Sequence, residues 1–151
     1  MRYYAMESPS HMKLPPVTKS SGFEIVAAKS IDRFEEVDYA ARGAIISNRL
    51  KLVMEMYLPK YDFEPVVFVK EGTNDMIEFW RFDPPIFKEC DAEYRNDDIV
   101  SRISFLSDEV EIPFIFTVTS PKGIKTIVMD MSAVNSILRR CISSIKFTKI
   151  L

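Results

Sequence analysis

The alternation of apolar and polar residues is most regular in the last quarter of the chain. Two apolar, β-branched runs, 114–119 and 124–129, are separated by the turn residues Ser120, Pro121, Lys122 and Gly123. Two such runs around a short turn are typical of a β-hairpin. Pro121 presets the φ angle of the second turn position and Gly123 suits the fourth, so the sequence predicts a turn that starts at Ser120.

A helix and a further strand are expected after this hairpin. Val134, Ile137, Leu138 and Cys141 recur at helical spacing, and Ser132 can cap the exposed amides of a helix over about 132–142. Residues 145–150 then alternate between apolar and polar, which predicts a strand that returns to the same sheet.

The middle of the chain repeats the same signals. Leu50, Val53, Met54, Tyr57 and Leu58 form one apolar helical face, so we expect an amphipathic helix over about 47–58, which Ser47 caps and Pro59 ends. Runs 63–69 and 76–82 flank a short polar loop and predict a second hairpin, with Pro65 at the beginning or the edge of its strand.

Shorter apolar runs at 2–6, 23–28 and 99–106 are candidate strands, whereas residues 31–43 and 86–98 carry no clear signal. Each expected helix follows an apolar run and a serine, and precedes a strand, which is a weak internal repeat. The sequence predicts a single α+β domain over residues 1–151. Its sheet is expected to be mostly antiparallel, built from hairpins, with two packed helices at about 47–58 and 132–142.

Net charge excludes two classes of partner. The 20 basic and 22 acidic side chains leave a net charge of -2, which gives no electrostatic basis for binding nucleic acid or an anionic membrane. No apolar run approaches the roughly 18 residues of a membrane-spanning helix. Since the first residues also lack the layout of a secretory signal, we expect a cytoplasmic protein.

Few residue types with catalytic or metal-binding chemistry are present. Cys90 and Cys141 stand far apart, and we interpret them as reduced, packed thiols; His11, the one histidine, lies in a loop rich in proline and serine. The sequence lacks a glycine-rich phosphate loop and paired metal ligands, so we expect no cofactor, no metal and no catalytic residue. This composition favours a binding protein over an enzyme.

The charge is unevenly distributed along the chain. Between Lys88 and Glu111, eight acidic residues oppose three basic ones, whereas after Thr119 six basic residues oppose Asp130 alone. An acidic segment is often only a solvated face, but it can also dock a basic protein, such as an enzyme that cleaves nucleic acid. The candidate docking residues are Glu89, Asp91, Glu93, Asp97, Asp98, Asp108, Glu109 and Glu111.

The order of several short motifs resembles bacterial immunity proteins of polymorphic toxin systems, in particular the type called immunity protein 43, with immunity protein 11 as a near relative. The resemblance covers most of the chain from Tyr3 to Phe147. It is carried by Arg2-Tyr3-Tyr4, Ile45-Ile46-Ser47-Asn48-Arg49-Leu50, Phe63-Glu64-Pro65-Val66-Val67, Phe79-Trp80-Arg81, Asp83-Pro84-Pro85, Pro113-Phe114-Ile115-Phe116, and Ser132 with Ile145-Lys146-Phe147.

The resemblance implies a non-enzymatic, cytoplasmic inhibitor that binds one cognate toxin of a contact-dependent or other secretion system. It implies structural roles for Ser47, Ser132, Pro65 and Trp80, and no catalytic residues. Two alternatives stay open: a general interaction or scaffolding module without a toxin partner, and a small hydrolase or nuclease that uses Asp91, Asp97 and Asp98 with a metal. The oligomeric state of the free protein also stays open.

Overall fold

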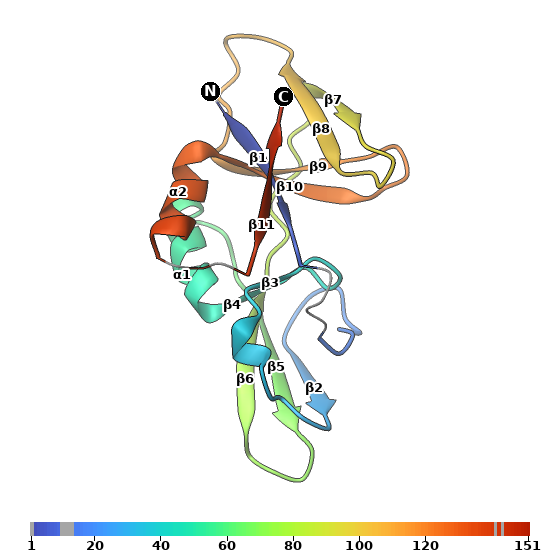
Figure 1. The fold of residues 1–151 in the computed structure, drawn as a ribbon, viewed down its shortest axis with the longest axis vertical. Helices are drawn as coiled ribbons and strands as arrows, with labels where there is room; N and C mark the ends of the chain where they lie inside the picture. The colour runs from blue at the N-terminus through green and yellow to red at the C-terminus, as the bar shows by residue number, and fades with distance from the viewer. Residues whose placement is uncertain (1, 10–13, 141, 143) are drawn as a thin grey trace. The chain divides into compact units, whose positions relative to one another are not determined.

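Hairpins supply most of the strands in the computed structural model, and two helices connect strands that are not neighbours in a sheet (Figure 1). The structure describes residues 2–9, 14–140, 142 and 144–151. Along this part of the chain the elements are β1 (Tyr3–Glu7), β2 (Glu24–Ala28), the short 3-10 helix η1 (Phe34–Glu36), β3 (Tyr39–Ala40), β4 (Ile45–Ser47), α1 (Asn48–Tyr57), β5 (Pro65–Lys70), β6 (Met76–Arg81), β7 (Cys90–Tyr94), β8 (Val100–Phe105), β9 (Ile115–Thr119), β10 (Lys125–Asp130), α2 (Met131–Arg139) and β11 (Lys146–Ile150).

The predicted α+β class is confirmed, with two helices and mostly antiparallel sheets. Both predicted hairpins form, β5 with β6 and β9 with β10, and β11 returns to the sheet that holds β9 and β10. The contacts of the chain group into two compact units. Unit 1 comprises Met1–Glu7, Asp83–Cys141 and Lys146–Leu151, and unit 2 comprises Ser8–Phe82 and Ile142–Ile145.

Unit 1 contains a four-stranded antiparallel sheet in the order β11-β1-β10-β9, together with the β7–β8 hairpin. Helix α2 packs on β10 and β1 through its buried residues Ala133, Val134 and Ile137. The opposite face of the sheet meets the hairpin around a group of aromatic rings. Ring centroids are 5.3 Å apart for Tyr3 and Phe105, and Phe116 is likewise buried among these rings.

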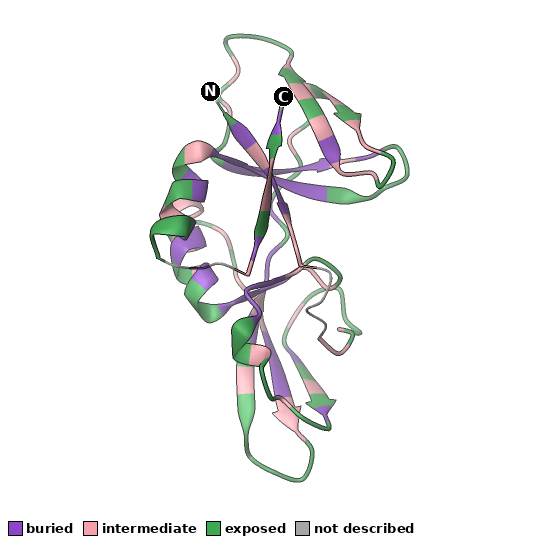
Figure 2. Ribbon diagram, in the orientation of Figure 1, coloured by how far each residue is buried: buried purple, intermediate pink, exposed green. Residues whose placement is uncertain are grey.

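Unit 2 contains a five-stranded sheet in the order β2-β5-β6-β4-β3, in which β2 and β5 are parallel. Its core includes Phe68, whose ring lies 5.5 Å from those of Phe34 and Phe79. Helix α1 covers β4 and β6 with its buried residues Leu50, Val53 and Met54. Figure 2 shows buried positions along β9 and β10 of unit 1 and along β4 and β5 of unit 2.

The two units share one strand arrangement. In unit 2, α1 joins the parallel strands β4 and β5, which flank the antiparallel strand β6. In unit 1, α2 joins the parallel strands β10 and β11, which flank the antiparallel strand β1. With β3 beside β4 and β9 beside β10, the order β3-β4-β6-β5 matches β9-β10-β1-β11, so the internal repeat extends to four strands of each sheet, and β2 has no counterpart in unit 1.

The caps of the two helices agree only partly with the sequence prediction. Ser47 caps α1 as expected, because its hydroxyl oxygen accepts a hydrogen bond from the Leu50 amide at 3.2 Å. The prediction that Ser132 caps the second helix is wrong. The helix begins at Met131, and the carboxylate of Asp130 accepts from the Ala133 amide at 3.0 Å, so Ser132 already lies in the first turn.

Several elements were not predicted. Residues 31–43 form η1 and the two-residue strand β3, and residues 86–98 contain β7. Cys90 is a half-buried free thiol whose pKa is raised by burial and by the neighbouring Asp91 carboxylate, whereas Cys141 and His11 lie outside the described residues. In the part of the chain that is described, neither helix is long and apolar enough to cross a membrane.

Candidate partner-binding surface

The β7–β8 hairpin carries most of the acidic segment and has two chemically different faces. Because side chains alternate along a strand, Cys90, Ala92 and Tyr94 point toward the core of unit 1, while Asp91 and Glu93 point outward. On β8, Ile103 and Phe105 likewise pack inward, and Arg102 is exposed. The inward residues hold the hairpin on the sheet, so the outward carboxylates are fixed in place by the core beneath them.

The register of the β7–β8 pairing changes at the end of the hairpin that is next to its turn. The pairing shifts between Glu93 and Tyr94, so that Tyr94 lies opposite Val100. The Tyr94 hydroxyl then donates to the carbonyl of Thr119 at 2.8 Å, which anchors this end of the hairpin to β9.

The two carboxylates in the turn of the β7–β8 hairpin are paired with basic residues of unit 1. Asp97 accepts two hydrogen bonds from the Arg95 guanidinium, at 2.7 and 3.0 Å, and the same guanidinium donates to Glu7 at 3.1 Å. The hydrogen bonds from Arg95 hold the pKa of Asp97 below its ordinary value. Asp98 adopts a φ of 64° and its carboxylate lies 3.9 Å from the Lys122 ammonium. Both charges are therefore partly neutralised by residues of unit 1.

Glu93 occupies the middle of the hairpin. Its carboxylate lies 3.9 Å from the guanidinium of Arg102, its cross-strand partner, and both side chains are largely exposed. An ion pair at this distance in water contributes little to stability, so both groups remain accessible to a partner.

The remaining carboxylates lie toward the other end of β8. Glu89 precedes β7, Asp91 is exposed near its start, and the loop 106–114 supplies three more exposed acidic residues. The Glu89 carbonyl accepts from the Leu106 amide at 3.2 Å, which ties the loop to the beginning of β7. Among the described residues, no basic group lies within ion-pair distance of these side chains. We call them the loop-end group: Glu89, Asp91, Asp108, Glu109 and Glu111.

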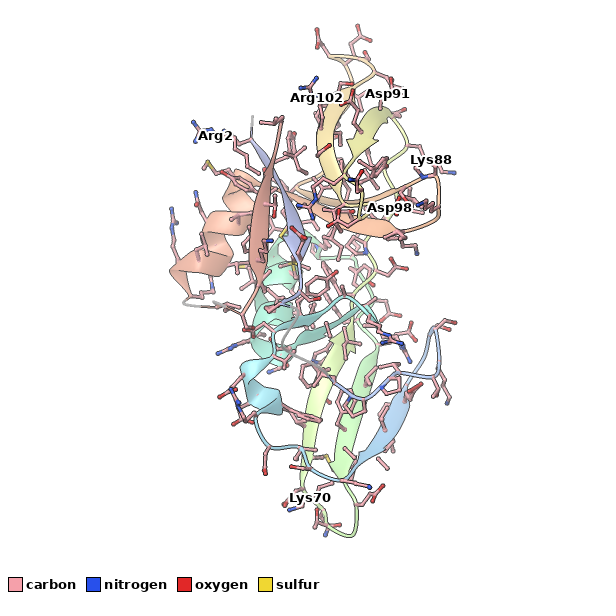
Figure 3. All side chains as sticks on the ribbon, turned by 45° about the vertical axis from the view of Figure 1, so that its right-hand side comes forward. Arg2, Lys70, Lys88, Asp91, Asp98 and Arg102 are labelled. Carbon is pink, nitrogen blue, oxygen red and sulfur yellow. The ribbon has the colours of Figure 1, made fainter. Side chains whose placement is uncertain are left out.

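The structure divides the eight predicted residues instead of gathering them. The turn carboxylates precede β8 and the loop residues follow it, so a strand of about 17 Å separates them, at about 3.4 Å per residue. Figure 3 shows Asp91 and Asp98 at separate places on the hairpin. Within the described residues, no group of three or more potential ligands is close enough to hold a metal ion.

Two buried carboxylates of unit 2 were missed by the sequence analysis. Asp38 is fully buried and accepts hydrogen bonds from Ser47 at 2.7 Å, from Ser144 at 2.6 Å and from Arg49 at 2.5 and 2.7 Å. These contacts connect the start of α1 with the segment before β3 and with Ser144. Their role is structural, because each polar group of Asp38 is engaged by its own chain.

Glu24 is the second buried carboxylate. Its oxygens accept from the Thr18 and Lys19 amides at 2.9 and 2.6 Å, and the Arg81 guanidinium lies 3.6 Å away. Burial acts to raise the pKa of Glu24, but these hydrogen bonds and the nearby guanidinium lower it overall. Each carboxylate also has one partner distant in sequence, Ser144 for Asp38 and Arg81 for Glu24, and local patterns do not predict these contacts.

A shallow pocket of about 250 Å³ lies elsewhere in unit 2. Its walls are mostly apolar, with Leu14, Val17 and Ile45, and Arg42 stands at its side. None of the eight acidic residues contributes to its lining. The outward carboxylates of unit 1 are therefore a site of a different kind, on an exposed hairpin and loop.

Comparison of the chain with protein families, with curated proteins and with solved structures found no match.

Proposed function

We propose that this protein is a non-enzymatic immunity protein that binds a cognate bacterial toxin effector in a stoichiometric complex and neutralises it. The order of motifs that resembles immunity proteins 43 and 11 motivates the proposal. The observation that supports it most is the loop-end group, whose five exposed carboxylates have no ion-pair partner among the described residues.

The loop-end group suits a basic partner. Carboxylates without an internal partner attract a basic surface, accelerate encounter and disfavour acidic competitors. Leu106 is 61% exposed beside them and offers an apolar contact that a polar rim would surround. A toxin that cleaves nucleic acid fits this description, because such enzymes carry basic surfaces for their substrate.

Co-expression with the product of the gene immediately upstream tests the proposal. We expect the two proteins to co-purify and the host, whose growth the upstream product alone arrests, to survive. Because slow dissociation is needed to hold a released toxin, the complex should bury roughly 800 Å² or more per partner. A toxic upstream product that neither binds this chain nor is neutralised by it would contradict the proposal.

Charge reversal tests the surface. The triple variant Glu89→Lys, Asp91→Lys, Glu109→Lys should lower the association rate constant by about tenfold or more at low salt, with a weaker salt dependence than the wild type. The matched control reverses three exposed carboxylates of unit 2, Asp32→Lys, Glu35→Lys and Asp75→Lys. If both triple variants lowered the association rate constant equally, the change in net charge alone would explain the effect. Binding without rescue of growth would favour the alternative, a general interaction or scaffolding module.

A further inference from the structure

Strand β2 is an unprotected edge of the sheet in unit 2. The other long edges are covered: Thr117 of β9 donates to the Pro85 carbonyl at 3.0 Å, and Leu151, beyond β11, donates to the Ser101 carbonyl at 3.1 Å. Strand β7 has carboxylates on its outward face, and β3 has two residues only. Among the described strands β2 pairs with β5 alone, and Figure 1 shows it as the outermost strand of its sheet.

The backbone of β2 offers unpaired groups along this edge. The Ala28 carbonyl points toward the β5 side, where it accepts from the Glu71 amide at 2.9 Å. Because N–H and C=O directions alternate along a strand, the backbone groups of Glu24 and Val26 also point to β5. Those of Ile25 and Ala27 therefore point away from the sheet.

The side chains at this edge are apolar and exposed. Ile25 is 62% exposed and Phe23 is 53% exposed. In the register of the sheet, Ala27, Val69 and Met76 lie side by side on the face that carries Ile25, and Met76 is 62% exposed. Helix α1 covers the other end of this face, where Asn48 accepts a hydrogen bond from the Trp80 indole. An exposed apolar edge strand of this kind is a pairing surface.

We propose that β2 pairs antiparallel with β2 of a second copy of this chain, which joins the two five-stranded sheets into one. With Val26 on the two-fold axis, Ile25 faces Ala27 of the second copy, and the outward N–H and C=O groups of these residues pair with one another. The same register places Phe23 opposite Lys29, where an ammonium group can lie over an aromatic ring.

The charges of the strand fit pairing with itself. Glu24, the acidic residue of β2, points to the opposite face, where the Thr18 and Lys19 amides and Arg81 engage its carboxylate. No like charges face each other across the two strands, since Lys29 meets an aromatic residue. The outward face of β2 carries no charge that would select an acidic or a basic partner. A second copy of this chain needs only the strand itself for pairing.

The size of the surface sets the strength of the dimer. One five-residue strand with its flanking side chains falls short of the roughly 800 Å² per partner of standard stable complexes. We therefore expect a reversible dimer with a dissociation constant in the micromolar range. The surface is separate from the loop-end group, so this proposal does not depend on the proposed immunity function.

Sedimentation velocity of the full chain from about 1 µM to about 500 µM tests the proposal, a range that brackets micromolar affinities. The weight-average mass of the wild type should rise from 17.5 kDa toward twice that value. Ile25→Lys should stay monomeric throughout, since a lysine on the edge opposes pairing. The matched control Leu52→Lys, at an exposed apolar position of α1, should associate like the wild type.

Amide hydrogen exchange gives an independent readout. The amide exchange of Ile25 and Ala27 should slow as the wild-type concentration rises, and that of the exposed loop residues 72–75 should not. A wild type that stays monomeric at every concentration, or an Ile25→Lys variant that associates as strongly as the wild type, would overturn the proposal. If Ile25→Lys loses its wild-type circular dichroism spectrum, Phe23→Lys replaces it with the same expected outcome.

Discussion

The helices of unit 1 and unit 2 begin at equivalent places in the same strand order, but their first turns are capped by different chemistry. In unit 1, the carboxylate of Asp130 itself accepts from an amide of α2. In unit 2, the hydroxyl of Ser47 accepts from an amide of α1 and donates to the buried carboxylate of Asp38. The second arrangement is a network, because Asp38 also holds Arg49 and Ser144.

The units also differ in where in the sequence the strand between the two parallel strands lies. In unit 2, β6 follows β5 through the loop 71–75, so its pairing is local. In unit 1, β1 comes from the start of the chain and pairs with β10 and β11, more than a hundred residues away. The same arrangement is thus built once from a hairpin and once from distant segments, which predicts slower folding for unit 1 than its size alone would suggest.

The largest effects are expected from the aromatic residues at the centre of each unit. Phe116→Ala and Phe68→Ala each remove a fully buried ring, and each should lower the free energy of unfolding by about 3 to 5 kcal/mol. Urea unfolding followed by circular dichroism measures both. The control Leu106→Ala, at an exposed position, should stay within about 0.5 kcal/mol of the wild type. A loss below about 1 kcal/mol for either phenylalanine would contradict the packing described for that unit.

The two caps should differ in the size of their contribution. Asp38→Ala leaves Ser47, Ser144 and Arg49 without their acceptor, and we expect a loss of about 2 to 4 kcal/mol, less than for a fully buried ion pair because the Arg49 side chain is half exposed. Asp130→Ala removes a local cap and should cost about 1 kcal/mol. Equal losses in urea unfolding would remove the distinction between a network and a local cap.

The network has a pH dependence that sharpens this test. Burial acts to raise the pKa of Asp38, but hydrogen bonds from Arg49, Ser144 and Ser47 lower it overall. Because the folded-state pKa of Asp38 is lowered, its ionised carboxylate stabilises the fold at pH values above the unfolded-state pKa of about 3.9. This stability is lost as the pH falls through the folded-state pKa. The difference in urea midpoint between the wild type and Asp38→Asn should therefore be largest near neutral pH and shrink below about pH 4.

Elements with strong local signals were predictable from the sequence. The β9–β10 hairpin and α1 were predictable because the 120–123 turn and the hydrogen bond from the Leu50 amide to Ser47 involve neighbouring residues. Strand β7 was missed because three of its five residues, Asp91, Ala92 and Glu93, are of types depleted in strands. Asp130 was overlooked because two capping residues stand within three positions and local sequence does not rank them.

Pairing between distant segments was beyond local patterns. The parallel pairing of β2 with β5 and the insertion of β1 between β10 and β11 leave no signature in the sequences of these strands, because the assembled core selects the pairing partners. The acidic set shows the same limit. The local excess of acidic residues between Lys88 and Glu111 identified eight carboxylates, but the Arg95 and Lys122 contacts that separate Asp97 and Asp98 from the loop-end group depend on the folded hairpin.

The smallest expected effects concern the hairpin turns, one in each unit. Gly72 follows β5 with a φ of 74° and Gly123 precedes β10 with a φ of 85°, and an added Cβ would meet no atom within 4 Å at either position. The cost of alanine is therefore backbone strain alone, about 1 kcal/mol for Gly72→Ala and for Gly123→Ala. Thermal unfolding measures both, with the exposed Lys122→Ala as control. A markedly larger loss for Gly123→Ala would mean that turn formation matters more in unit 1, where the other strand pairings are distant in sequence.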